Sequence, residues 1–205
     1  MVEFARQADF NIVNLGAEEL SAEKLIRETP VELHKKILAA RIFGGIKTYH
    51  HKLNAAGDVV GTVEFDLNED ESQGTQKFIA LSGPVTHTLE EGSILVIDEL
   101  EARLHPKLTQ AIVDLFHSPV NERNAQLVCA THDVTLLDPE RFRRDQVWFC
   151  EKGSDGATSL FSLAEFDPQK VRSTTKFSRQ YMLGLFGAVP KLAHFQEAAA
   201  YAVKE

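Results

Sequence analysis

The chain has 205 residues, of which 43% are hydrophobic and 25% charged, a composition typical of one soluble globular domain with a substantial core. Its formal net charge of −8 argues against a protein that binds nucleic acid regardless of sequence, because such a protein needs a basic surface to neutralise phosphates. No apolar stretch approaches the roughly 18 residues of a membrane span, and the first residues lack the apolar core of a signal peptide. We therefore expect a cytoplasmic protein.

The first part of the chain predicts a polar segment and then a β-hairpin. Residues Ser21–Lys36 are polar and helix-prone, as in a connector. Two β-prone runs, Ile46–Leu53 and Val59–Phe65, flank the turn-forming residues Asn54–Asp58. Residues 46–65 therefore predict a hairpin, which we expect as a separate lobe of a single domain.

A helix and a buried strand are expected next. Ser72–Thr75 predicts the start of a helix that runs to about Leu81, because Gly83-Pro84 should break it before a short second piece to Leu89. The run Ser93–Ile97 is continuously apolar rather than alternating, which is typical of a strand buried on both faces of a parallel sheet.

The second half of the chain continues the α/β order. Pro106–Phe116 predicts a helix with proline in its first turn, where no backbone N–H is missed. Gln126–Thr131 and Gln146–Cys150 predict further buried strands, Thr158–Phe161 a short strand, and the tail around Gly184–Gly187 a helix. This order indicates an α/β sheet with right-handed crossovers.

Two carboxylates, Asp98 and Glu99, end the first buried strand. The carboxyl ends of strands are where open α/β sheets bind ligands. The first carboxylate of such a pair can orient Mg²⁺, and the second can polarise an attacking water as a general base. Without further motifs, the pair is also typical of a buried strand that ends in a solvated acidic turn.

Two other motifs have both a structural and a chemical interpretation. Ser72–Thr75 can be a plain helix N-cap, or its free N–H groups, its hydroxyl and Gly74 can bind an anion. His132, about 33 residues after the carboxylates, can be structural or can donate a hydrogen bond to a transferred phosphoryl group.

Taken in order, four motifs resemble those of ABC-like ATPases of the SMC and RecF type. Glu71–Thr75 resembles the signature, Ile94–Glu99 the Walker B strand, Leu100–Pro106 the D-loop and Ala130–Asp133 the His switch. The resemblance is to AAA-family ATP-binding proteins of the abortive-infection kind, and it covers residues 4–192.

The resemblance implies a fold, a site and two ligands. The fold is a partial P-loop NTPase sheet with flanking helices and a hairpin, the C-terminal portion of an ABC-like head in residues 1–205, with its core in residues 71–192. The ligands are ATP and Mg²⁺. The implied site residues are Asp98 for the metal, Glu99 and His132 for catalysis, and Ser72, Gly74 and Thr75 for the nucleotide of the opposite subunit.

The sequence lacks the phosphate loop G-x-x-x-x-G-K-[ST], whose backbone and lysine hold the phosphates. The nearest segment ends in Lys47-Thr48, but Arg41 and Ile46 occupy the two glycine positions. In the related ATPases the strand before this loop lies between those that correspond to residues 126–131 and 146–150, so we expect a gap there. Another polypeptide could supply the missing half, the two strands could pair directly, or the chain could be a fragment or one part of a split gene.

Three functions compete on this evidence. The first is the C-terminal part of an ATPase, inactive alone, that acts as a head-to-head homodimer or with a chain carrying the Walker A half. The resemblance implies phage defence or a DNA-linked switch, with a nuclease-type effector. The second is a non-catalytic remnant or regulatory module that docks on a full-length homologue. The third is a metal-dependent nuclease using Asp98, Glu99 and Glu101.

Overall fold

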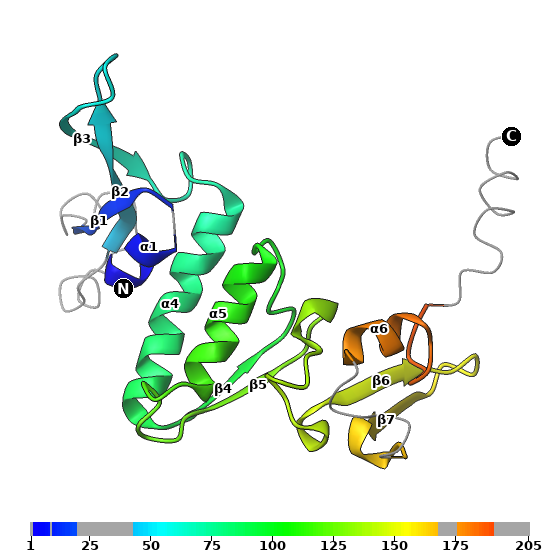
Figure 1. Ribbon diagram of the computed structural model, residues 1–205. Helices are drawn as coiled ribbons and strands as arrows, with labels where there is room; N and C mark the ends of the chain where they lie inside the picture. Colours follow the sequence, from blue (N-terminus) through cyan, green and yellow to red (C-terminus); the bar gives the residue numbers. More distant parts are fainter. Residues whose placement is uncertain (1, 9, 20–42, 168–175, 191–205) are drawn as a thin grey trace, which may run out of the picture. The chain divides into compact units, whose positions relative to one another are not determined.

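The computed structural model describes residues 2–8, 10–19, 43–167 and 176–190 in two compact units, Met1–Thr131 and His132–Glu205 (Figure 1). The elements of the first unit are α1 (Val2–Gln7), β1 (Ile12–Glu19), β2 (Phe43–Leu53), β3 (Val59–Asp66), α4 (Gln73–Glu91), β4 (Ile94–Ile97), α5 (Pro106–His117) and β5 (Gln126–Cys129). The second unit contains β6 (Trp148–Lys152), β7 (Thr158–Ser162), α6 (Phe177–Met182) and the short 3₁₀ helices η1 (Val134–Leu136), η2 (Arg144–Gln146) and η3 (Leu163–Glu165). The predicted connector Ser21–Lys36 lies outside the described residues.

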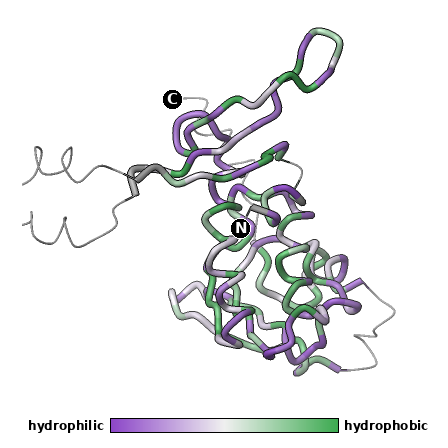
Figure 2. The backbone as a smooth tube through the Cα atoms, turned by 90° about the vertical axis from the view of Figure 1, so that its left-hand side faces the viewer, coloured by the Kyte–Doolittle hydropathy of each residue, from purple (hydrophilic) through white to green (hydrophobic). Residues whose placement is uncertain are grey.

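The predicted hairpin is confirmed as the antiparallel pair β2–β3. Its turn is held by Asn54, whose side-chain oxygen accepts hydrogen bonds from the N–H groups of Ala56 and Asp58, both at 2.9 Å. Gly57, at φ 88°, takes the left-handed conformation that this turn requires. In Figure 1 the hairpin extends away from α4, and Figure 2 shows hydrophobic residues at its projecting end.

The hairpin is part of a three-stranded sheet in the order β1–β2–β3, and whether it forms a separate lobe stays a prediction. β1 pairs with β2 in antiparallel register. The sequence did not predict β1. A hydrophobic cluster joins this part of the chain to α4. It contains Ala5, Ile12, Leu67 and Ile79, with Phe10, Leu15 and Ile46 packed against it.

The helix α4 is continuous from Gln73 to Glu91, so the predicted break at Gly83-Pro84 is wrong. The buried face of α4 runs past the proline from Thr75 to Thr88. Pro84 has no N–H, so the carbonyl group of Ala80 lacks its helical partner. Both residues are exposed. Water can hydrate that carbonyl, so packing of the opposite face holds the helix together.

The predicted parallel pair is confirmed: β4 and β5 pair in register from Ile94↔Gln126 to Ile97↔Cys129. The predicted burial on both faces is wrong. Ile97 is buried, and α4 contacts β4 while α5 contacts β5. On the opposite face Ile94, Val96 and Val128 are 63%, 72% and 55% exposed. We call these three residues the open face of the β4–β5 sheet.

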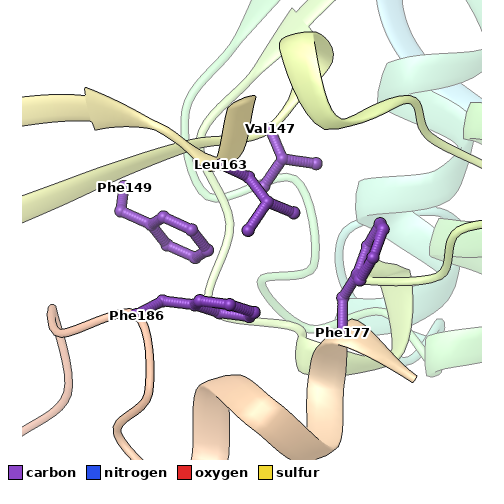
Figure 3. Close-up of a cluster of buried hydrophobic side chains, with 5 residues drawn as sticks. All are labelled: Val147, Phe149, Leu163, Phe177 and Phe186. Atoms are coloured by element: carbon purple, nitrogen blue, oxygen red, sulfur yellow. The ribbon is translucent and has the colours of Figure 1, made fainter. Parts of the chain in front are cut away.

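The second unit is built on the antiparallel pair β6–β7. The predicted third strand therefore exists, but its partner in the described sheets is β7. Its core is the cluster Val147, Phe149, Leu163, Phe177 and Phe186 (Figure 3). The helical tail predicted around Gly184–Gly187 is wrong, because α6 ends at Met182 and both glycines have positive φ.

Among the described helices, none combines the length and apolar character needed to span a bilayer.

Candidate functional site

Ser72 caps the N-terminus of α4, as the sequence predicts. Its side-chain oxygen accepts a hydrogen bond from the Thr75 N–H at 3.1 Å, and its carbonyl accepts one from Gln76 N–H at 3.0 Å. Gln73 and Gly74 are the first two residues of the helix. Their amides have no acceptor within the helix, because no helical carbonyl lies one turn before them. Such amides, at the positive end of the helix dipole, suit an anion.

The two hydroxyl groups of this motif lie together. Ser72 Oγ and Thr75 Oγ1 are 2.9 Å apart, so one donates a hydrogen bond to the other. Ser72 is exposed, whereas Thr75 is buried. Ser72 is therefore accessible to a ligand, while the side chain of Thr75 supports the start of the helix.

Asp98 and Glu99 are both exposed at the carboxyl end of β4. The chain turns sharply at Glu99, whose φ of 49° lies in the left-handed region. The next residue, Leu100, is fully buried, and its N–H donates to the Ala130 carbonyl at 3.2 Å. This turn leaves both carboxylates in solvent, where their oxygens can serve as ligands of the kind that Mg²⁺ prefers.

The segment after the carboxylates folds into two successive turns before α5. The Ala102 N–H donates to the Glu99 carbonyl at 3.0 Å, and the Leu104 N–H donates to the Glu101 carbonyl at 2.9 Å. His105 then caps α5, since its Nδ1 accepts a hydrogen bond from the Lys107 N–H at 3.2 Å.

The signature segment and the predicted D-loop lie against each other. A Cβ atom built on Gly74 would be 2.9 Å from the Arg103 carbonyl oxygen, closer than real Cβ contacts come. Arg103 itself has a φ of 66°. Glycine is therefore needed at position 74 for the approach of the protein's own backbone, in addition to the anion contact that the sequence suggests.

His132 is the first residue of the second unit and is exposed. Its predicted approach to the nucleotide beside Asp98 and Glu99 stays a prediction. In the described part of the chain there is no group of three or more His, Cys, Asp or Glu residues that could hold a metal ion.

A polar cluster that the sequence did not predict surrounds Glu71, the residue before the N-cap. Glu71 Oε1 lies 2.5 Å from Thr48 Oγ1 and 2.6 Å from His50 Nε2. Thr48 and His50 are two residues apart on β2 and so share one face of the strand. The available signal was this alternation of polar residues on a strand, but their partner is more than 20 residues away in the sequence.

Comparison with known families gives a match to residues 22–138, which is more than half of the chain. The matching family is described as "AAA domain, putative AbiEii toxin, Type IV TA system". The chain belongs to this family. The predicted resemblance to an ABC-like AAA ATPase is thereby confirmed.

A curated relative supports the same family. The energy-coupling factor transporter ATP-binding protein EcfA1 of Latilactobacillus sakei subsp. sakei (strain 23K) is 28% identical over 104 residues. The match covers 50% of this chain and 35% of EcfA1, so the chain corresponds to about a third of that relative's length. No solved structure matches.

Proposed function

We propose that this chain is the part of an ABC-like ATPase that carries the signature, Walker B, D-loop and His-switch motifs. A polypeptide segment with a phosphate loop would complete the site, and two heads would close on ATP. The observation that carries the proposal is the approach of the Arg103 carbonyl to Gly74, because it joins the signature helix to the loop that follows Asp98 and Glu99.

The proposed roles follow from exposure and chemistry. Bound Mg²⁺ would neutralise charge on the transferred phosphoryl group. Asp98 supplies carboxylate oxygens for this ion, and Glu99 accepts a proton from the attacking water. His132 donates a hydrogen bond to the γ-phosphate. Ser72 and Gly74 present a hydroxyl and a backbone amide to the nucleotide of the opposite head, with Thr75 supporting them.

The cellular process is proposed from the family alone. The family description names a toxin of a toxin–antitoxin system, which suits a switch in phage defence, with a nuclease-type effector as partner. A DNA-linked switch is the other form of the same proposal. In each, closure and opening of the heads would drive the effector.

The test is ATP turnover by the completed assembly. The tagged chain is purified from its native cells, and a co-purifying polypeptide containing G-x-x-x-x-G-K-[ST] is identified by mass spectrometry. Mg-ATP hydrolysis is then measured beside Glu99→Gln and the control Glu90→Gln, an exposed carboxylate of α4. We expect Glu99→Gln to lower kcat by about 100-fold or more with ATP binding retained, and Glu90→Gln to leave kcat unchanged.

Two outcomes would contradict the proposal. If the Glu99→Gln assembly hydrolyses ATP as fast as the wild-type assembly, Glu99 is not the general base. An assembly that forms but never hydrolyses ATP would favour the non-catalytic module instead. Calorimetry on the chain alone should detect no Mg-ATP binding, and micromolar binding would mean that this chain itself holds the phosphates.

A further inference from the structure

Glu71, the first residue of the segment that resembles the signature, places a carboxylate inside the protein. Its side chain is 8% exposed. Its Oε1 accepts hydrogen bonds from the Thr48 hydroxyl at 2.5 Å and from His50 Nε2 at 2.6 Å. Thr48 is fully buried, and the His50 ring packs on Phe65 of β3 with 4.8 Å between ring centroids. The partners of Glu71 are therefore fixed by the three-stranded sheet.

The backbone around Glu71 is held as well. The side-chain amide of Gln76 donates to the Glu71 carbonyl at 2.9 Å and to the Asn68 carbonyl at 3.2 Å. Leu67, four residues before Glu71, lies in the hydrophobic cluster that joins β1 to α4. The turn between β3 and α4 is thus anchored on both sides of the carboxylate.

Capping alone does not explain a buried carboxylate at this position. Ser72 already accepts the Thr75 N–H, so Glu71 is not needed as the N-cap of α4. Burying a carboxylate is costly unless hydrogen bonds compensate it, and here both compensating donors come from one strand. The contact therefore fixes the place of Glu71, and of Ser72 after it, relative to β2.

On its other side, the segment meets the Arg103 carbonyl at Gly74. We infer that Glu71 is a positioning residue for the signature sequence, and that Thr48 and His50 act through it to place Ser72 and Gly74 for the phosphate. The inference rests on the proposed function for its role in turnover. Its structural half, control of the first turn of α4 by β2, can be measured without nucleotide.

The first measurement is amide hydrogen exchange along α4 in the whole chain. Thr48→Val keeps the shape of the side chain and removes the donor, and Glu71→Ala removes the acceptor. We expect exchange at residues 75 and 76, whose amides donate to Ser72, to accelerate by about tenfold or more, as for loss of a hydrogen bond to a charged group. Exchange at residues 78–88 should stay within about twofold of the wild type, since the opening is local.

Two further variants separate positioning from general loss of stability. Thr62→Val makes the same replacement at an exposed position of β3 and should change exchange nowhere in α4. Glu71→Gln keeps an oxygen that can accept from Thr48, so it should restore most of the protection at residues 75 and 76. Unchanged exchange there in Glu71→Ala, or equal acceleration along all of α4, would overturn the inference.

The second measurement is turnover by the completed ATPase assembly. Glu71→Ala should lower kcat by about tenfold or more with KM within about twofold, because the signature acts on a nucleotide held elsewhere. Glu71→Gln should recover most of kcat. A change in KM alone would contradict the role in turnover. If the wild-type assembly shows no turnover, the proposed function fails, while the exchange data still decide whether Glu71 positions the signature.

Discussion

At the scale of single residues, the backbone of Glu99 is held in a conformation that residues other than glycine rarely adopt. Its φ of 49° costs on the order of 1–2 kcal/mol for an L-residue. Complete burial of the neighbouring Leu100 contributes about 1.5–3 kcal/mol, and its N–H pairs with the Ala130 carbonyl. The burial of Leu100 therefore outweighs the strain that keeps Glu99 exposed.

This strain predicts that Glu99→Gly stabilises the fold. Glycine removes the left-handed penalty but adds freedom to the unfolded chain, so we expect the free energy of unfolding to rise by about 0.5 kcal/mol. Urea denaturation of the chain measures this change. The same variant should not support ATP turnover, because the proposed general base is gone.

Ala102→Gly is the matched control for this prediction. Ala102 lies in the same loop but is not among the residues with positive φ. Glycine at position 102 increases the conformational entropy of the unfolded chain and relieves no strain, so the free energy of unfolding should fall by about 0.5–1 kcal/mol. Changes of the same sign in both variants would mean that Glu99 is not strained.

At the scale of elements, local patterns predict most of the described structure. The hairpin and α5 follow from residues close together in the sequence, and β4 and β5 were each predicted from an apolar run of their own. The strand β1 was missed because its partner β2 follows only after a long intervening segment. The contact of Gly74 with Arg103 was missed for the same reason, although the Ser72 cap of the same site is local.

The predicted break in α4 failed for a different reason. A proline inside a helix predicts a break because it removes one backbone hydrogen bond. This prediction does not take into account which side of the helix faces solvent. Here the exposed side carries Pro84, and the buried residues Ile79, Ser82 and Val85 continue past it. Tertiary packing therefore overrides a local signal, and sequence patterns alone cannot reveal this packing.

Pro84→Ala should stabilise α4. An N–H at position 84 restores the bond to the Ala80 carbonyl, and little packing is lost at an exposed position. We expect the free energy of unfolding to rise by about 1–3 kcal/mol, measured by urea denaturation. Glu90→Ala, exposed in the same helix, should stay within about 0.5 kcal/mol of the wild type. A loss of stability in Pro84→Ala would show that the fold depends on the geometry of the proline.

At the scale of the whole molecule, the described residues leave the open face of the β4–β5 sheet exposed. Parallel sheets are normally covered on both faces. Here Ile94, Val96 and Val128 are exposed on one face, and among the described residues β4 and β5 form a sheet of two strands. In a complete P-loop fold, strands from the segment with the phosphate loop would extend this sheet at its edge, and the helix after that loop would cover the open face. The proposed partner and the exposed residues thus fit each other.

Val96→Lys tests this assignment. Val96 is 72% exposed, so a lysine can reach water and the free energy of unfolding of the chain should change by less than about 0.5 kcal/mol. Within the assembly the same lysine would be buried without a partner charge, which should abolish co-purification of the polypeptide carrying the phosphate loop. The matched control is Leu53→Lys at the 57% exposed end of the hairpin, where co-purification should persist. Equal loss in both variants would mean that charge alone disrupts the assembly. Strong destabilisation of the isolated Val96→Lys chain would mean that this chain already covers the face.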